Sequence, residues 1–181
     1  MLDCVKVTTH SSDILTQLEN ALSDAHGAGP GEPALRYHYS SPANLAPLQD
    51  FATRHPKDVL LYHIPFGVAV KGKVVTLICD GLLETMGQPS SNKEKRLRKL
   101  DRFITQRSAR KIRMIILADA HNLSTGSRRR PLLSDFYALV SFLKNGGMPV
   151  NTTVLFTGEQ DVLEPLIMQD TSLIRRFSAL L

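Results

Sequence analysis

Two apolar segments decide the fold of this 181-residue chain: residues 112–120, which read IRMIILADA, and residues 152–158, which read TTVLFTG. Continuous apolar runs of this length are typical of strands buried on both faces of a parallel sheet. A third run, DVLLYHI at 58–64, has strand length and is stopped by Pro65 and Gly67. The sequence therefore predicts at least three buried strands.

Segments with helical spacing separate these strands. Pro131 begins and Gly147 ends one such segment, in the positions that these residues favour at helix ends. Alternation of strands with helices favours an α/β domain with a mostly parallel sheet. The expected helices are residues 45–55, 74–87, 93–107, 131–147 and 160–177.

The first 33 residues differ from the rest of the chain. Residues 12–25 have the apolar spacing of an amphipathic helix, and HGAGPGEP at 26–33 ends it. We expect residues 1–33 to form an N-terminal helix with a Gly/Pro linker, and residues 34–181 to form a single α/β core. The sequence leaves open whether this helix packs on the core.

Composition excludes several classes of protein. The chain is 43% hydrophobic, which argues against disorder, and no apolar run approaches the roughly 20 residues that span a bilayer. The N-terminus lacks the pattern of a secretory signal. Cys4 and Cys79 are too few for a disulfide framework or a zinc site. We expect a cytoplasmic protein without a bound metal or a membrane contact.

Positive charge is concentrated in a few segments. The chain has 22 Lys and Arg against 17 Asp and Glu, and ten of the basic residues lie in residues 93–113. Such basic segments contact phosphate backbones, although a solvated helix face is an equal alternative. The candidate DNA-binding residues are Lys95, Arg96, Arg98, Lys99, Arg102, Arg128, Arg129 and Arg130.

Common catalytic motifs are absent from the sequence. It contains no G-x-x-x-x-G-K-[ST] phosphate loop, G-x-S-x-G, H-E-x-x-H or dinucleotide glycine fingerprint. Asp80, Asp119 and His121 suggest an acid–base group, but polar residues at the end of a buried strand commonly mark only the edge of the core. The residues alone indicate an α/β domain with basic patches.

The segment from Arg113 onward resembles a known family. RMIILADAHNLSTGSRRR, then FLKNGG, then VLFTGEQDVLEPLIMQDTSLIRRF are similar to the transposon AAA+ ATPase subunits called TniB and their relative TnsC. FATRHP (51–56) and HIPF (63–66) extend the resemblance over residues 34–181. It implies an AAA+-like P-loop NTPase fold, a three-layer sandwich. The matching residues are His121, Asn122, Leu123, Gly126, Ser127, Asp170, Leu173, Arg176 and Phe177.

The nucleotide-binding motifs of that family are altered here. Its phosphate loop falls on HYSSPANL (38–45), where His38 and Ala43 replace glycines, Asn44 replaces lysine and Leu45 replaces the Mg²⁺-binding hydroxyl. Ser40 and Ser41 supply the hydroxyls that remain. In the Walker B strand, Ala118 replaces the metal-binding aspartate and Asp119 the catalytic glutamate. The alternative register makes Asp119 the metal ligand and Ala120 the catalytic position, so one carboxylate is missing either way.

Other parts of the ATP machinery also differ. Thr157 precedes the glycine of the sensor 1 strand instead of following it, and the chain stops at Leu181, before the family's C-terminal helical lid. Arg175 and Arg176 match the position of an arginine that reaches a neighbouring subunit. The resemblance implies a degenerate pseudo-ATPase that uses no cofactor, binding ATP and Mg²⁺ only if the altered site still accepts them, with Asp119 as the catalytic residue if it is active.

Three functions follow from these features. The first is a binding or regulatory role in DNA transposition, through docking on DNA, a transposase or an active AAA+ partner. The second is an active or nucleotide-binding NTPase with an unorthodox site, in which Asp119 and Ser40 or Ser41 recruit Mg²⁺. The third is a repurposed α/β interaction scaffold, or a decayed mobile-element protein. Apolar surface that a lid normally covers also predicts self-association.

Overall fold

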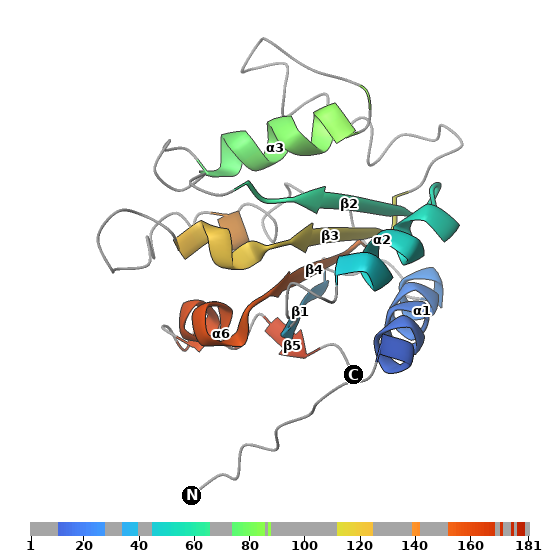
Figure 1. Cartoon of the computed structure of the whole chain (residues 1–181), viewed down its shortest axis with the longest axis horizontal. Coiled ribbons are helices and arrows are strands. Elements are labelled where there is room, and N and C mark those ends of the chain that lie inside the picture. The colour runs from blue at the N-terminus through green and yellow to red at the C-terminus, as the bar shows by residue number, and fades with distance from the viewer. Residues whose placement is uncertain are drawn as a thin grey trace, which may run out of the picture.

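A five-stranded sheet forms the centre of the computed structural model, which describes residues 11–27, 34–39, 45–65, 74–85, 87, 112–124, 139–141, 152–168, 171, 175 and 177–179. The strands lie in the order β2-β3-β4-β1-β5 (Figure 1), and every neighbouring pair is parallel. This arrangement confirms the predicted α/β class. The strands are β1 (Ala34–Tyr39), β2 (Val59–His63), β3 (Met114–Ala118), β4 (Thr153–Gly158) and β5 (Phe177–Ala179).

Helices cover both faces of the sheet and give the fold three layers. Along β3, Ile115 and Leu117 face one apolar cluster, whereas Met114 and Ile116 face the other. This alternation follows from the two-residue repeat of a strand, and it explains why the segment is apolar throughout. The helices are α1 (Ser11–Gly27), α2 (Leu45–Arg54), α3 (Val74–Thr85), η3 (Ala120–Ser124) and α6 (Gln160–Met168).

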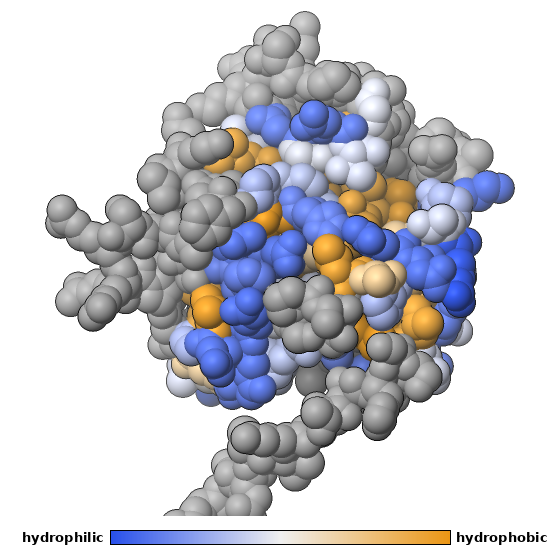
Figure 2. Space-filling view, in the orientation of Figure 1, coloured by the Kyte–Doolittle hydropathy of each residue, from blue (hydrophilic) through white to orange (hydrophobic). Residues whose placement is uncertain are grey.

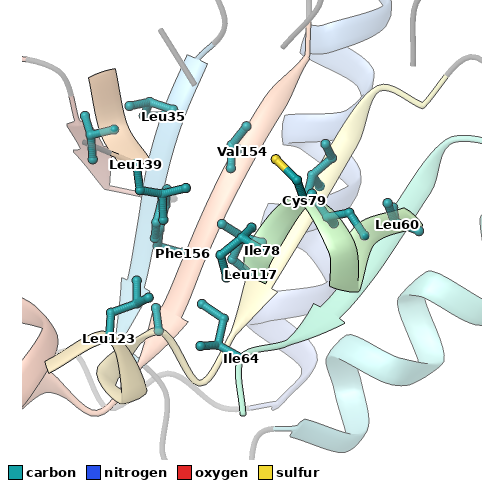
Figure 3. Close-up of a cluster of buried hydrophobic side chains, with 14 of the residues drawn as sticks. Leu35, Leu60, Ile64, Ile78, Cys79, Leu117, Leu123, Leu139, Val154 and Phe156 are labelled. Carbon is teal, nitrogen blue, oxygen red and sulfur yellow. The ribbon is translucent and has the colours of Figure 1, made fainter. Parts of the chain in front are cut away.

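The larger cluster lies between the sheet and the layer that contains α3, η3 and α6. Ile78, Leu117, Val154 and Phe156 converge there, as Figure 3 shows. Each of these side chains is at most 1% exposed. Their burial supplies much of the hydrophobic stabilisation of the fold, at about 25 cal/mol per Å² of apolar surface.

Helix α1 packs on the opposite face of the sheet. Its apolar residues Ile14, Leu18 and Leu22 share a cluster with Leu48 and Phe51 of α2. A hydrogen bond and an ion pair accompany this contact: His55 Nε2 lies 2.9 Å from Glu19 Oε1, and Arg36 Nη2 lies 3.5 Å from Asp24 Oδ2. The apolar face of α1 is therefore buried within this chain, against α2 and the sheet.

The predicted helix at 160–177 is wrong at its C-terminal end. Helix α6 ends at Met168, and Phe177 begins the short strand β5 beside β1. Helical spacing indicated that Phe177 continues a helix, but its ring packs edge-on against Phe156, with ring centroids 5.3 Å apart. The contact joins β4 and β5, which lie on either side of β1. The spacing of apolar residues within a short segment therefore cannot predict it.

Two further differences concern short elements. Strand β1 was not predicted from an apolar run, because its sequence ALRYHY contains Arg36, Tyr37, His38 and Tyr39, which all carry polar groups. Residues 120–124 form the 3₁₀ helix η3, although Ala120 belongs to the apolar segment 112–120 that was predicted as a strand. The predicted basic helix at 93–107 and most of the predicted helix at 131–147 lie outside the described residues.

Candidate functional site

The ends of four parallel strands define the candidate site. Strands β1, β2, β3 and β4 end at Tyr39, His63, Ala118 and Gly158, and we call the sheet margin formed by these ends the carboxyl edge. The arrowheads of β2 and β3 point toward it, to the left in Figure 1. Open α/β sheets bind their ligands outside the carboxyl ends of strands. The residues at this edge are therefore the candidates for chemistry.

Asp119 directly follows β3 in an unusual backbone conformation. Its φ is 57°, in the left-handed region, and it is the one non-glycine residue with positive φ in the described ranges. Aspartate is among the few residues that tolerate this region, and such conformations persist only where the surrounding structure imposes them. The backbone therefore turns immediately after Ala118 and leads into η3, which begins at Ala120.

His63 is the partner of Asp119 at this edge. His63 Nδ1 lies 3.3 Å from Asp119 Oδ2, and the two side chains are 38% and 36% exposed. In a neutral His63, Nδ1–H donates to the carboxylate and leaves Nε2 as an acceptor. His63 was not among the site residues expected from the sequence. The sequence feature that could have identified it is its position at the end of β2, because Asp119 directly follows the end of β3. Because solvent screens this pair, its main effect is to orient both side chains.

Asn122 fastens the turn after Asp119 to the neighbouring strand. Its Nδ2 donates to the carbonyl of Ile64 over 2.8 Å, and its backbone N–H donates to the carbonyl of Asp119 over 2.9 Å. The Ile64 N–H in turn donates to the Ala118 carbonyl over 3.0 Å. Only 9% of Asn122 is exposed. The ends of β2 and β3 are thus held as one unit.

His121 links the same turn to β4. Its Nδ1 lies 3.4 Å from the backbone nitrogen of Glu159, which donates the hydrogen bond. The backbone of this turn also lies close to Gly158: a Cβ at position 158 would lie 3.0 Å from the backbone nitrogen of His121, so a larger residue there would push the turn outward by a few tenths of an ångström. His121 and Asn122, two residues of the family motif, therefore position the backbone at the carboxyl edge.

The residues that the resemblance assigns to nucleotide binding lie partly in strands, partly in α2 and partly outside the described residues. His38 lies within β1, pairs with Thr157 of β4 and is 7% exposed. Leu45 is the first residue of α2, and its side chain packs against the cluster beneath that helix. Thr157 is buried, with 1% of its surface exposed. The residues outside the described ranges are Ser40, Ser41, Ala43 and Asn44.

The predicted basic residues are mostly outside the described structure. Arg175 is exposed in a turn, where its backbone N–H donates to the carbonyl of Thr171 over 3.3 Å. The carboxyl edge does not include Arg175, which precedes β5 instead of following a strand. The predicted residues without a description are Arg176, Lys95, Arg96, Arg98, Lys99, Arg102, Arg128, Arg129 and Arg130.

Two of the positions that the resemblance assigns to Mg²⁺-ATP carry side chains without oxygen atoms. Magnesium is held by carboxylate and hydroxyl oxygens together with the phosphates, yet the relevant positions carry the methyl group of Ala118 and the isobutyl group of Leu45. Asp119 provides one carboxylate, and it contacts His63. Within the described ranges, no group of three or more His, Cys, Asp or Glu side chains is arranged to hold a metal ion.

Comparison with known proteins defines the class of fold. No protein-family model matches the chain, and no curated protein sequence does. Solved structures of Drosophila ORC, an AAA+ ATPase, do match. ORC bound to AT-rich DNA and Cdc6 gives a TM-score of 0.57 at 13% identity. ORC with poly(dA/dT) DNA and Cdc6 gives 0.58 at 12%.

Each of these matches covers 93% of this chain and 28% of the other chain. The chain thus spans less than a third of the length of the proteins it resembles. At this identity the likeness concerns the fold alone, and it shows an α/β fold of the AAA+ P-loop NTPase type. None of the described helices is long and apolar enough to cross a membrane.

Proposed function

We propose that this chain is a degenerate TniB-like AAA+ protein that acts by binding, without hydrolysing ATP. In this proposal it is a binding or regulatory component of DNA transposition and docks on DNA, a transposase or an active AAA+ partner. The observation that carries the proposal is the end of β3, where buried Ala118 is followed by Asp119 in contact with His63.

Hydrolysis of ATP needs more than this edge supplies. A metal-bound nucleotide is cleaved when one group holds the Mg²⁺ and another orients the attacking water. Ala118 and Leu45 offer no oxygen for the ion, so among the described residues of the resembled motifs Asp119 would have to serve both purposes. An AAA+-type fold that lacks these oxygens supports a protein that binds partners through its surface and does not hydrolyse ATP.

The distribution of charge supports DNA contact through the basic segments. The described residues include five Lys or Arg and eleven Asp or Glu, a formal charge of −6. Because the whole chain carries +5, the remaining residues carry +11. A duplex is repelled by the described part and attracted by segments such as 93–111 and 128–130. The ORC complex that shares this type of fold is bound to AT-rich DNA, and that is a property of the ORC complex.

A matched pair of charge reversals tests DNA binding. Arg98→Glu/Arg102→Glu alters the basic segment, whereas Arg54→Glu/Lys57→Glu makes the same change of charge at the end of α2 and just after it. Binding to a labelled random-sequence duplex, followed by fluorescence anisotropy, should weaken about tenfold or more in the first variant only. Binding should also fall steeply with salt. Equal losses in both variants would contradict contact through the basic segment.

The unorthodox NTPase remains as a second candidate because Asp119 is held in a left-handed conformation at this edge. It requires Mg²⁺-dependent release of phosphate that Asp119→Ala abolishes. We expect no release above the level of a blank, with or without duplex DNA. Turnover that Asp119→Ala removes would replace the binding proposal with this one.

A further inference from the structure

Helix α1 packs on parts of the chain that are distant from it in sequence. Its buried apolar side chains are at most 4% exposed, and they are Ile14, Leu18, Ala21 and Leu22. They share a cluster with residues of α2, β2, β3 and β4, which we call the α1 surface: Leu48, Phe51, Val59, Met114, Ile116 and Leu155. Figure 2 shows hydrophilic side chains along the right margin, where α1 and α2 lie side by side in Figure 1. The apolar residues of α1 are thus directed inward, against the α1 surface.

The charges on the two sides of this contact are complementary. Residues 11–27 include three carboxylates and no Lys or Arg. Glu19 Oε1 lies 2.9 Å from Nε2 of His55, which directly follows α2. Asp24 Oδ2 lies 3.5 Å from Nη2 of Arg36, which lies in β1. The surface therefore suits an amphipathic helix with apolar side chains four residues apart and carboxylates at these two positions.

The covalent connection between α1 and the sheet allows this helix to be supplied by either of two copies. Residues 28–33, which read AGPGEP, join α1 to β1. Six residues span at most about 20 Å when they are extended. A span of that length reaches the surface of the same copy or that of a copy beside it. The recognising contacts, apolar packing and two polar pairs, are the same in both cases.

We propose that copies of this chain exchange α1, so that α1 of each copy packs on the α1 surface of the other. Exchange keeps both surfaces covered, whereas a vacated surface would expose large apolar side chains such as Phe51 and Leu48. Domain swapping of this kind reuses the contacts of the monomer and is a low-cost route to a dimer. Helix and surface of one copy compete at an effective concentration in the millimolar range, which is typical of short flexible connections. The exchanged dimer therefore becomes prominent as the concentration of the chain approaches that range.

A charge-swap experiment tests the exchange. The helix variant is Glu19→Lys/Asp24→Lys, and the surface variant is Arg36→Glu/His55→Glu. Each variant alone opposes like charges within its own contact, and exchange between identical copies does not relieve this. In an equimolar mixture, exchange between unlike copies restores opposite charges in both contacts. In sedimentation velocity at about 50 mM salt, the mixture should form a dimer with a dissociation constant at least about tenfold lower than that of either variant alone.

Two controls separate exchange from general attraction between charged chains. The chain with all four substitutions restores opposite charges within one copy, so it should be monomeric at the concentration at which the mixture dimerises. The helix variant mixed with Arg54→Glu/Lys57→Glu, which changes charge at exposed positions, should also be monomeric. If a variant is unfolded by circular dichroism, the single substitutions Glu19→Lys and His55→Glu replace the pairs.

The wild-type chain provides the second measurement. At about 1 mM it should contain dimer, because that concentration matches the effective concentration of a tethered helix. A wild-type chain that is monomeric at about 1 mM would overturn the proposal. A mixture of folded variants that stays monomeric, or a four-substitution chain that dimerises as the mixture does, would overturn it as well.

Discussion

The aromatic ring of Tyr62 occupies the space directly in front of Gly81. A Cβ built on Gly81 would lie 2.0 Å from Cζ of Tyr62, so the absence of a side chain at this position of α3 lets the helix approach β2. The hydroxyl end of the ring lies near the same point, at 2.2 Å from that hypothetical Cβ. Gly81 therefore serves packing, although glycine inside a helix costs about 1 kcal/mol relative to alanine.

Substitution of Gly81 should have opposite effects in two backgrounds. In the wild-type chain, Gly81→Ala forces the Tyr62 ring to move and should lower the free energy of unfolding by about 1–3 kcal/mol. With Tyr62→Ala already present, the same change should raise it by up to about 1 kcal/mol, through helix propensity alone. Urea unfolding of the four proteins measures this coupling. Additive effects would show that the ring does not occupy this space.

Tyr62 should titrate at higher pH than an exposed tyrosine. Burial raises the pKa of its hydroxyl above 10.0, and the negative charges of Glu84 and Asp80 add to the effect. The raised pKa contributes stability that is present below about pH 10 and is lost as pH rises through the folded-state value. Tyr62→Phe should therefore unfold less readily than the wild type with increasing pH in that alkaline range. Thermal melting of both proteins between about pH 9 and 11 measures this difference.

Loss of the Asn122 amide should weaken the joined ends of β2 and β3. Asn122→Ala leaves the carbonyl of Ile64 without its donor in a buried place, at an expected cost of about 1–3 kcal/mol in unfolding free energy. Gln160→Ala removes a bond of similar length, 3.0 Å, from an exposed position on α6, and should cost less than about 0.5 kcal/mol. Chemical unfolding compares the two. Similar small losses would mean that Asn122 does not fasten the turn.

The effect of a substitution at Asp119 on stability should depend on how well the new residue tolerates a positive φ. Asparagine tolerates the left-handed region and should preserve most of the stability, whereas alanine should cost about 1 kcal/mol or more. Asp119→Gly relieves the backbone but loses the contact with His63, so it should fall between the two. Thermal melting ranks the three variants. If alanine and glycine were equal, the left-handed conformation of Asp119 would not contribute to stability.

Much of this fold is predictable from sequence because several of its strands are buried on both faces. Residues 114–117 and 154–156 are apolar because each of these side chains belongs to one of two buried clusters, and a short stretch of sequence is enough to show that. Strand β5 is not predictable in this way because three residues contain no periodicity; its position depends on pairing with β1 and on contact between Phe177 and Phe156.

The candidate site is only partly predictable for the same reason. Ala118 and Asp119 are identified by their place at the end of an apolar run and by resemblance to a family motif. His63 is 56 residues away from Asp119 in the chain, and only the parallel pairing of β2 with β3 brings the two together. No local pattern indicates that contact, nor the bond from Asn122 to the carbonyl of Ile64.

Our proposal requires this AAA+-type fold to act without an ATP cycle. Calorimetric titration of the purified chain with Mg²⁺-ATP, in the absence and presence of duplex DNA, tests that requirement most directly. We expect no binding heat beyond dilution in either condition, because Ala118 and Leu45 supply no oxygen at the two positions that the resemblance assigns to the metal. A saturable isotherm with a micromolar dissociation constant would contradict the proposal and make the chain a nucleotide-dependent switch.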